Sequence, residues 1–190
     1  MRVRRTVWIA GLLALFVLAG ILWQAFHRAP AASGGLQSLD QKPARLVYGQ
    51  RATIVMLMAT WCKYCAYDDR YVWPALMHTP GVTLDIVNVS PYGGIGNPGP
   101  QNPPFSGQDE VGARVGAAGM AANLRRYLAV FHLQAANIHP FIDPAGVSHW
   151  NIQYFPTILF INRQGQVVTR SNGALTLPEA RRALARTLKS

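Results

Sequence analysis

The only two cysteines of the chain lie two residues apart within the segment Trp61-Cys62-Lys63-Tyr64-Cys65. They follow residues 53–59, a short apolar run that is typical of a strand buried on both faces. A helix beginning at Cys62 would place that thiol beside unpaired backbone N–H groups and the positive end of the helix dipole, which stabilise a thiolate. The positive charge of Lys63 would stabilise the thiolate further. The spacing therefore favours a redox-active dithiol, with Cys65 about one turn after Cys62.

Two other roles are open to this cysteine pair. A structural zinc site needs four ligands, but the chain has no second cysteine pair, and His132 and His139 stand seven positions apart in another segment. A permanent disulfide across two residues would close a short loop and add little stability. Redox exchange is the favoured role, and it requires no metal and no cofactor because the dithiol itself carries the electrons.

The composition indicates one folded domain. The 190 residues are 50% hydrophobic and 14% charged, which is too apolar for a disordered chain. The net charge is +10, and much of the excess lies near the two ends of the chain. Because no aromatic side chains are interleaved with the C-terminal basic residues, we interpret them as a solvated helix face and predict no nucleic-acid binding.

A long apolar block near the N-terminus indicates where the domain resides. Residues 7–26 are interrupted only by Gln24, and about 20 helical residues span the hydrocarbon core of a bilayer. Arg2, Arg4 and Arg5 precede the block and favour a cytoplasmic N-terminus. Residues 1–28 are therefore predicted to be a single-pass cell-membrane anchor, with the domain extracytoplasmic, in the periplasm or on the outer face.

A cleaved signal segment is the alternative to an anchor. Ala29-Pro30-Ala31 resembles a small-residue cleavage site, although signal peptides usually have a shorter apolar region. The domain would then be secreted, and both interpretations export residues 32–190. The small-residue run at 31–35 belongs to a predicted flexible linker, residues 29–44.

The rest of the chain is predicted to form alternating strands and helices, with one long insertion between them. Ser90 to Gly107 contains five Pro and five Gly, which predicts a long surface insertion, at about 90–120. The other predicted elements, in chain order, are a helix from Cys62 broken or re-aimed near Pro74, a buried strand at 82–89, a helix around 124–131, a hairpin of 158–161 with 166–168, and a final helix capped by Thr176 and Glu179.

Several of these segments, in this order, resemble the thioredoxin-like superfamily. The resemblance covers residues 45–190 apart from the insertion. It implies an α/β thioredoxin fold, a central mixed sheet flanked by helices, with one N-terminal transmembrane helix before it. The matching segments are Ala59-Thr60-Trp61-Cys62-Lys63-Tyr64-Cys65, Asp143-Pro144-Ala145-Gly146, Tyr154-Phe155-Pro156-Thr157, Asn162-Arg163-Gln164-Gly165 and Gly173-Ala174-Leu175.

The resemblance also assigns site residues. Pro156 matches the cis-proline that packs against the redox-active disulfide of Cys62 and Cys65 and leaves neighbouring backbone free to pair with an extended substrate. An ordinary proline at the start of a strand is the alternative for Pro156. The supporting residues implied around the two cysteines are Trp61, Lys63, Tyr64 and Phe155.

The sequence departs from thioredoxin at three places. Lys-Tyr replaces Gly-Pro between the cysteines, and Met56 stands where thioredoxin has a buried acid, so no carboxylate on that strand can take a proton from Cys65. Asp68 and Asp69 are expected on the exposed side of the helix, which leaves water or an unidentified base for this role. The insertion, with Tyr92 and Phe105, is interpreted as a lid, a partner-binding loop or a plain exposed loop.

The expected function is that of an extracytoplasmic thiol–disulfide oxidoreductase, more as a reductase than as a thiol oxidase. The resemblance implies exported thiol or disulfide proteins as partners, apocytochrome c among them, and a membrane thiol carrier as electron donor. A copper metallochaperone on the same fold is the alternative, because thiolates suit Cu(I). It would use Cys62, Cys65 and a later His or Met, with His132, His139 and His149 as the candidate histidines.

Overall fold

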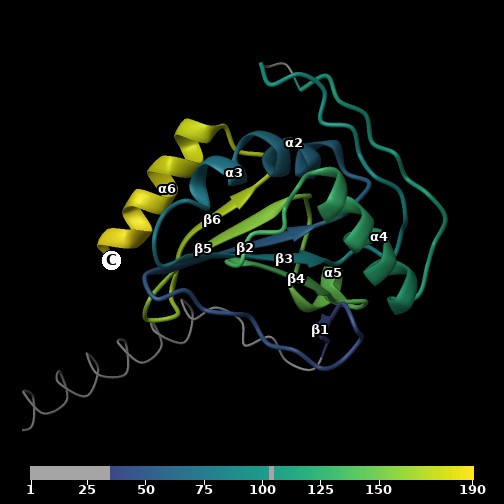
Figure 1. Cartoon of the computed structure of the whole chain (residues 1–190), viewed down its shortest axis with the longest axis horizontal. Coiled ribbons are helices and arrows are strands. Elements are labelled where there is room, and N and C mark those ends of the chain that lie inside the picture. The colour runs from purple at the N-terminus through teal and green to yellow at the C-terminus, as the bar shows by residue number, and fades with distance from the viewer. Residues whose placement is uncertain (1–34, 103–104) are drawn as a thin grey trace, which may run out of the picture.

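The computed structural model describes residues 35–102 and 105–190. The predicted anchor at 7–26 and residues 29–34 of the predicted linker lie outside these residues. Within the described part of the chain, no helix is both long and apolar enough to cross a membrane. The described residues form a mixed sheet covered by helices, and every residue of its strands at 52–58 and 157–162 is buried (Figure 1).

The sheet has six strands in the order β1-β4-β3-β2-β5-β6. The central strand β2 pairs in parallel with β3 and antiparallel with β5. The predicted strands at 53–59 and 82–89 are confirmed as β2 and β3, and the predicted hairpin is β5 with β6. The strand bounds are β1 Gln37–Ser38, β2 Ala52–Met58, β3 Val82–Asn88, β4 Ile138–Ile142, β5 Thr157–Asn162 and β6 Val167–Asn172.

Alternate side chains of β2 pack into two hydrophobic cores, one on each face of the sheet. Ile54 and Met56 belong to the larger core, together with side chains of the helices α2 (Lys63–Tyr71), α3 (Trp73–Leu76), α4 (Ala117–Val130) and α6 (Leu177–Lys189). Val55 and Leu57 face the smaller core, which the segment after α5 (Gly146–His149) covers. Figure 1 shows the four helices of the larger core gathered over one side of the sheet.

The helix predicted to start at Cys62 is broken where expected. Cys62 is the N-cap of α2, which ends at Tyr71, and α3 begins at Trp73 with Pro74 in its first turn. A proline is tolerated there because the first-turn N–H has no helical partner. The break re-aims the chain so that the Trp73 Nε1–H donates to the Sδ of Met56, 3.1 Å away, in the larger core.

The structure differs from the prediction at four places. Strand β4, helix α5 and the short strand β1 were not predicted, and residues 36–44, assigned to a linker, belong to the fold. The sequence conceals β4 because His139 and Pro140 interrupt its apolar pattern. Leu36 is 3% exposed and belongs to the smaller core, since β1 adds to the edge of β4.

The insertion after β3 has no regular helix or strand among its described residues. Its two limbs run side by side, joined by isolated bridges that pair Tyr92 with Arg114 and Asn97 with Gln108. We call residues 91–102 and 105–115 the strap. Figure 1 shows its two limbs extending from the strand ends past α2.

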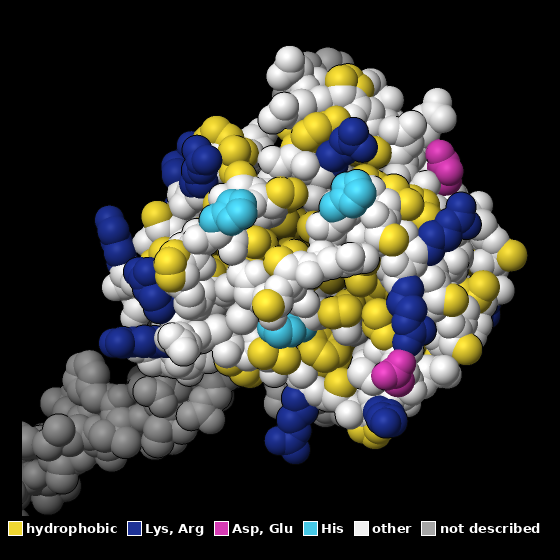
Figure 2. Space-filling view, in the orientation of Figure 1, with side chains coloured by type: hydrophobic (Ala, Val, Ile, Leu, Met, Phe, Trp, Pro, Cys, Tyr) yellow, Lys and Arg dark blue, Asp and Glu magenta, His cyan; other side chains and the backbone are white. Residues whose placement is uncertain are grey.

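The charged side chains on the face shown in Figure 2 are mostly Lys and Arg. They are spread over this face with other side chains between them, and few Asp or Glu side chains accompany them. On this face the basic side chains form no continuous stripe.

Candidate active site

The two thiols differ in environment. Cys62 is the N-cap of α2 and 3% exposed, whereas Cys65, in the first turn, is completely buried. The pKa of the Cys62 thiol is lowered, first by a hydrogen bond from the Cys65 thiol and then by the backbone N–H groups of Cys65 and Tyr64, although burial opposes this. Burial raises the pKa of Cys65 well above its usual range. Cys62 is therefore the thiol suited to the first attack, whereas Cys65 stays protonated until a later step.

The loop before β5 lies against Cys62. The Phe155–Pro156 peptide bond is cis, and Pro156 is buried. The Sγ of Cys62 lies 3.8 Å from the carbonyl oxygen of Phe155. The rings of Trp61 and Phe155 meet edge to face at 5.8 Å, and Trp61 Nε1–H donates to the Oγ of Ser90 at 2.8 Å. The structure thus brings together the predicted residues Trp61, Cys62, Cys65, Phe155 and Pro156.

The side chain of Lys63 does not lie against the Cys62 sulfur, where its charge was expected to stabilise the thiolate. Its ammonium lies 5.2 Å from the ring centroid of Tyr64, which is 37% exposed. The lowered pKa of Cys62 comes chiefly from hydrogen bonds at the start of α2. Lys63 contributes its backbone instead, because its N–H donates to the carboxylate of Asp109, 2.8 Å away.

The strap crosses the active-site segment. The N–H of Gly96 donates to the carbonyl oxygen of Thr60 at 2.9 Å, and the N–H of Glu110 donates to that of Trp61 at 3.0 Å. A Cβ on Gly96 would lie 2.6 Å from the backbone of Trp61 and Cys62, so only glycine fits this approach. The insertion is therefore not a plain exposed loop, because both limbs pack against the segment that carries Cys62.

Known protein structures resemble this architecture, although no family model and no curated protein sequence matches the chain. A thioredoxin-like protein from Aeropyrum pernix has a TM-score of 0.58 at 13% identity, covering 92% of this chain and 98% of its own. This chain has a thioredoxin fold. A secreted Mycobacterium tuberculosis disulfide oxidoreductase homologous to Escherichia coli DsbE has a TM-score of 0.55 at 13% identity, covering 80% and 94%. A thiol:disulfide interchange protein of the thioredoxin family from Chlorobium tepidum has a TM-score of 0.51 at 19% identity, covering 85% and 96%.

The prediction for two acids on α2 of this thioredoxin fold was wrong. Asp68 and Asp69 were expected to be exposed, but both are completely buried. Their helix is covered by the sheet, by α4 and by the segment before α6. The Oδ1 of Asp68 accepts the N–H of Leu175 at 2.9 Å, and the Oδ2 of Asp69 accepts the hydroxyl of Tyr127 at 2.6 Å.

Asp69 is the carboxylate best placed to exchange a proton with Cys65. It follows Cys65 by four residues, so the two side chains share a face of α2, with about 5–6 Å between Cβ atoms. Burial raises the pKa of Asp69 to about 7, and the hydrogen bond from Tyr127 acts in the opposite direction. A carboxyl with this pKa can take up or release a proton near neutral pH. Thus α2 supplies a buried acid that β2 lacks at Met56.

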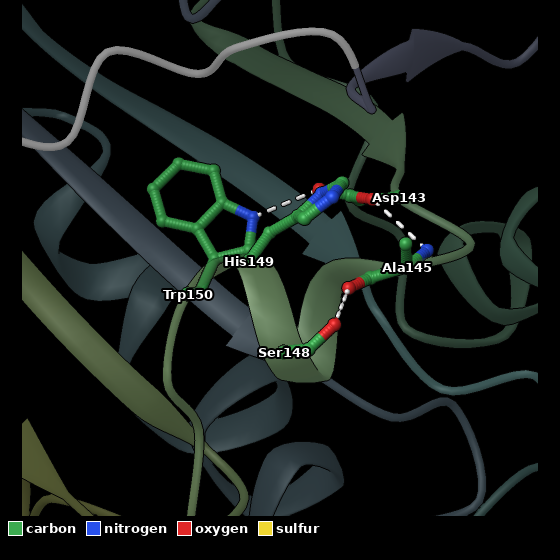
Figure 3. A network of polar contacts seen from close by, with 5 residues as sticks. All are labelled: Asp143, Ala145, Ser148, His149 and Trp150. Atoms are coloured by element: carbon green, nitrogen blue, oxygen red, sulfur yellow. Dashed lines mark hydrogen bonds and ion pairs between the residues drawn. The ribbon is translucent and has the colours of Figure 1, made fainter.

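The segment Asp143-Pro144-Ala145-Gly146 has a structural role at the end of β4. The carboxylate of Asp143 accepts hydrogen bonds from the backbone N–H of Ala145 at 3.1 Å and from Trp150 Nε1–H at 3.0 Å (Figure 3). Its Oδ2 also lies 3.3 Å from Nδ1 of His149. The network fixes α5 against the end of β4.

The candidate histidines of the copper alternative do not join the two cysteines in a metal site. In residues 35–102 and 105–190, no group of three or more His, Cys, Asp or Glu side chains is arranged to hold a metal ion. His149 contacts Asp143 instead of the two cysteines. The structure therefore offers no observation that favours copper transfer over thiol exchange.

Sequence reasoning missed Asp69, Tyr127, Gly96 and Asp109 as parts of this site. Only Asp69 carried a local signal, its spacing of four residues from Cys65. Gly96 and Asp109 reach the site through hydrogen bonds between segments far apart in the chain. Residues 90–110 carry no periodic pattern from which such contacts could be predicted.

Proposed function

We propose that this protein is a thiol–disulfide oxidoreductase that reduces disulfides of exported proteins. The observation that carries the proposal is the asymmetry of the two thiols. Cys62, with its lowered pKa, caps α2 beside the Phe155–Pro156 loop, and Cys65 lies behind it with a raised pKa. The thioredoxin fold and the names of two structural neighbours, a disulfide oxidoreductase and a thiol:disulfide interchange protein, support the same activity.

The reaction consists of two exchanges. The Cys62 thiolate attacks one sulfur of the substrate disulfide, forms a mixed disulfide with it, and releases the other sulfur as a thiolate that takes up a proton. The Cys65 thiolate then attacks the Cys62 sulfur, so that the Cys62–Cys65 disulfide forms and the second substrate sulfur leaves. Two electrons pass from the dithiol to the substrate, which leaves as a dithiol.

The second exchange needs a group that takes the proton of Cys65. Asp69 is that group in our proposal, because it lies on the same face of α2 and its pKa of about 7 suits proton transfer at neutral pH. Tyr127 holds the carboxylate by its 2.6 Å hydrogen bond. Water has no direct access, since Cys65, Asp69 and Tyr127 all have no exposed surface.

The extracytoplasmic setting belongs to the proposal as well. The apolar block at 7–26 and the arginines before it would anchor the domain outside the cytoplasm, and one structural neighbour is described as secreted. A reductase in that compartment needs electrons from the cytoplasm, for which a membrane thiol carrier is the expected donor. Exported thiol proteins, apocytochrome c among them, are the expected substrates.

Cysteine variants and an exchange assay test the chemistry. Wild type should reduce insulin disulfides with dithiothreitol as the source of electrons. Cys62→Ser should abolish attack, whereas Cys65→Ser should retain it and accumulate long-lived mixed disulfides that mass spectrometry detects. Equal loss of attack in both variants would contradict the assigned roles.

The equilibrium with glutathione tests the direction of electron flow. A potential near that of thioredoxin, about −270 mV, supports reduction, and one near that of the strong periplasmic oxidant, about −120 mV, supports thiol oxidation. A value above about −180 mV, close to that of disulfide isomerase, would overturn the reductase assignment.

A further inference from the structure

The first backbone N–H groups of α2 donate to two different acceptors. The first N–H groups of a helix have no partner within the helix and bind negative charge. The N–H groups of Tyr64 and Cys65 stabilise the sulfur of Cys62. The N–H of Lys63 instead donates to Asp109, a residue of the strap that is 46 positions away in the sequence. A carboxylate and a thiolate therefore share one helix terminus.

Asp109 is held in this position by its neighbours in the strap. The N–H of Gln108 donates to the carbonyl oxygen of Asn97 at 2.9 Å, and the N–H of Glu110 donates to that of Trp61 at 3.0 Å. The backbone on both sides of Asp109 is thus tied, once to the other limb of the strap and once to the active-site segment. These two hydrogen bonds fix the backbone position of Asp109, whereas an ordinary surface acid has no such constraint.

The charge of Asp109 acts against the Cys62 thiolate. The hydrogen bond from Cys65 is the main cause that lowers the pKa of Cys62, while burial and then the charge of Asp109 act in the opposite direction. The lysine next to Cys62 does not offset this charge at the sulfur, because its ammonium lies over the ring of Tyr64.

Two of the other titratable groups around Cys62 carry no charge at neutral pH. Burial raises the pKa of Cys65 and of Tyr127 well above their usual ranges, so both stay protonated. Burial also raises the pKa of Asp68 well above its usual range. Asp69, whose pKa is about 7, is partly ionised at neutral pH, but its carboxylate accepts the hydroxyl of Tyr127 on the inner side of α2. Asp109 is consequently the exposed carboxylate of the described residues that bears on Cys62.

We propose that Asp109 is a positioning residue through which the strap makes the Cys62–Cys65 dithiol a stronger reductant. By occupying the N–H of Lys63 and placing a negative charge at the start of α2, it withholds stabilisation from the Cys62 thiolate. A less stabilised thiolate means a less stabilised reduced form, which gives up its electrons more readily. This inference rests on the proposed thiol exchange and extends it to the insertion, which counteracts the oxidising effect of the helix terminus.

Substitution of Asp109 in the full-length protein tests this inference. Asp109→Asn keeps an acceptor for the Lys63 N–H and removes the charge, and Asp109→Ser does the same with a smaller side chain. The matched control is Glu110→Gln, which removes the neighbouring charge in the strap. The pH dependence of iodoacetamide modification at Cys62, located by mass spectrometry, gives the pKa of this thiol.

Both Asp109 variants should lower the pKa of Cys62 and increase its acid dissociation constant about two- to fivefold, the usual size of a charge effect at a helix terminus. At a pH above the Cys62 pKa, the equilibrium with glutathione should shift toward the dithiol by the same factor. Asp109→Glu should retain the wild-type values more closely, and Glu110→Gln should change neither quantity.

The outcomes separate this inference from the proposed function. An unchanged or raised Cys62 pKa in Asp109→Asn and Asp109→Ser, or an equal change in Glu110→Gln, would overturn the role of Asp109. A wild-type protein that exchanges with no disulfide would instead refute the proposed function, and the alkylation measurement would still report on the charge of Asp109.

Discussion

Cys65 has no exposed surface, so its proton has to pass to a group inside the protein. Met56 cannot accept it, and the Sδ of Met56 is already the acceptor of Trp73. Asp69, one helical turn after Cys65, combines a shared helix face with a pKa of about 7. Asp69, which the sequence analysis placed on an exposed helix face, thus supplies the buried titratable group that the reaction requires.

Replacement of Asp69 by Asn should slow the second exchange far more than the first. Because general base catalysis contributes about 10²-fold or more, the Cys62–Cys65 disulfide should form from a preformed mixed disulfide about 10²-fold more slowly at pH 7. Attack by Cys62 on a substrate disulfide should stay within about twofold of wild type. Stopped-flow release of the substrate thiol measures both steps.

Two comparisons sharpen the Asp69 test. Tyr127→Phe removes the hydrogen bond that opposes the raised pKa of Asp69, so the pH at which the second exchange reaches half its maximum should increase. Asp40→Asn removes an exposed carboxylate that pairs with Arg125 and should leave both rates unchanged. A second exchange that keeps its wild-type rate and pH profile in Asp69→Asn would exclude Asp69 as the proton acceptor.

Asp85 gives a second pH-dependent effect, on stability instead of rate. Burial raises the pKa of this carboxyl from 3.8 to about 7, and the hydrogen bond from the Val47 N–H, at 2.8 Å, opposes the shift. Between these two pH values the folded protein binds more protons than the unfolded chain. The free energy of unfolding should therefore decrease as pH rises from about 4 to 7.

Urea unfolding at several pH values measures this dependence. Asp69 contributes in the same direction and over the same range, because its folded pKa is also about 7. Asp85→Asn should reduce the slope of unfolding free energy against pH, whereas Asp40→Asn should leave it unchanged. A wild-type protein that gains stability across this range would contradict the assignment of both buried carboxyls.

At the scale of elements, the sequence predicted what short-range pattern determines. The apolar runs of β2 and β3, the break before Pro74 and the capping box of Thr176 with Glu179 are all present in the structure. Strand β4 was missed because pairing with β3, and not its own pattern, makes Ile138–Ile142 a strand. The burial of Asp68 was missed because it depends on Leu175, which is 107 positions away.

Gly96 is the position at which contact between the strap and α2 can be tested. A Cβ there would lie 2.6 Å from backbone atoms of Trp61 and Cys62, which have no freedom to move aside. Gly96→Val should displace this limb of the strap, increase the rate of Cys62 alkylation per unit of thiolate, and decrease the free energy of unfolding by about 1–3 kcal/mol.

Gly116→Ala is the matched control for Gly96. A Cβ at Gly116 meets no atom within 4 Å, and its φ of −80° suits any residue. This variant should keep the wild-type alkylation rate and stability within about 0.5 kcal/mol. If Gly96→Val leaves Cys62 as slow to react as in wild type, the strap does not control access to this thiol.

At the scale of the whole molecule, segments far apart in the sequence enclose the redox chemistry. The reacting thiols are almost completely buried between α2, the strap and the Phe155–Pro156 loop. The Lys and Arg side chains are instead scattered over the face shown in Figure 2. The expected solvated face of the C-terminal helix is confirmed, because Arg181, Arg182, Arg186 and Lys189 of α6 are all exposed.

The proposed location of the domain can be tested by its accessibility to protease. The arginines before Val7 and the apolar block at 7–26 favour a cytoplasmic N-terminus and an external domain. In spheroplasts, protease added outside should therefore digest residues 32–190 and spare the extreme N-terminus, while a cytoplasmic marker protein remains intact. Full-length mass in the membrane fraction indicates an anchor, and a mature chain starting near Ala31 indicates cleavage. A domain that becomes digestible only after the cells are lysed would lie in the cytoplasm and would overturn the extracytoplasmic role.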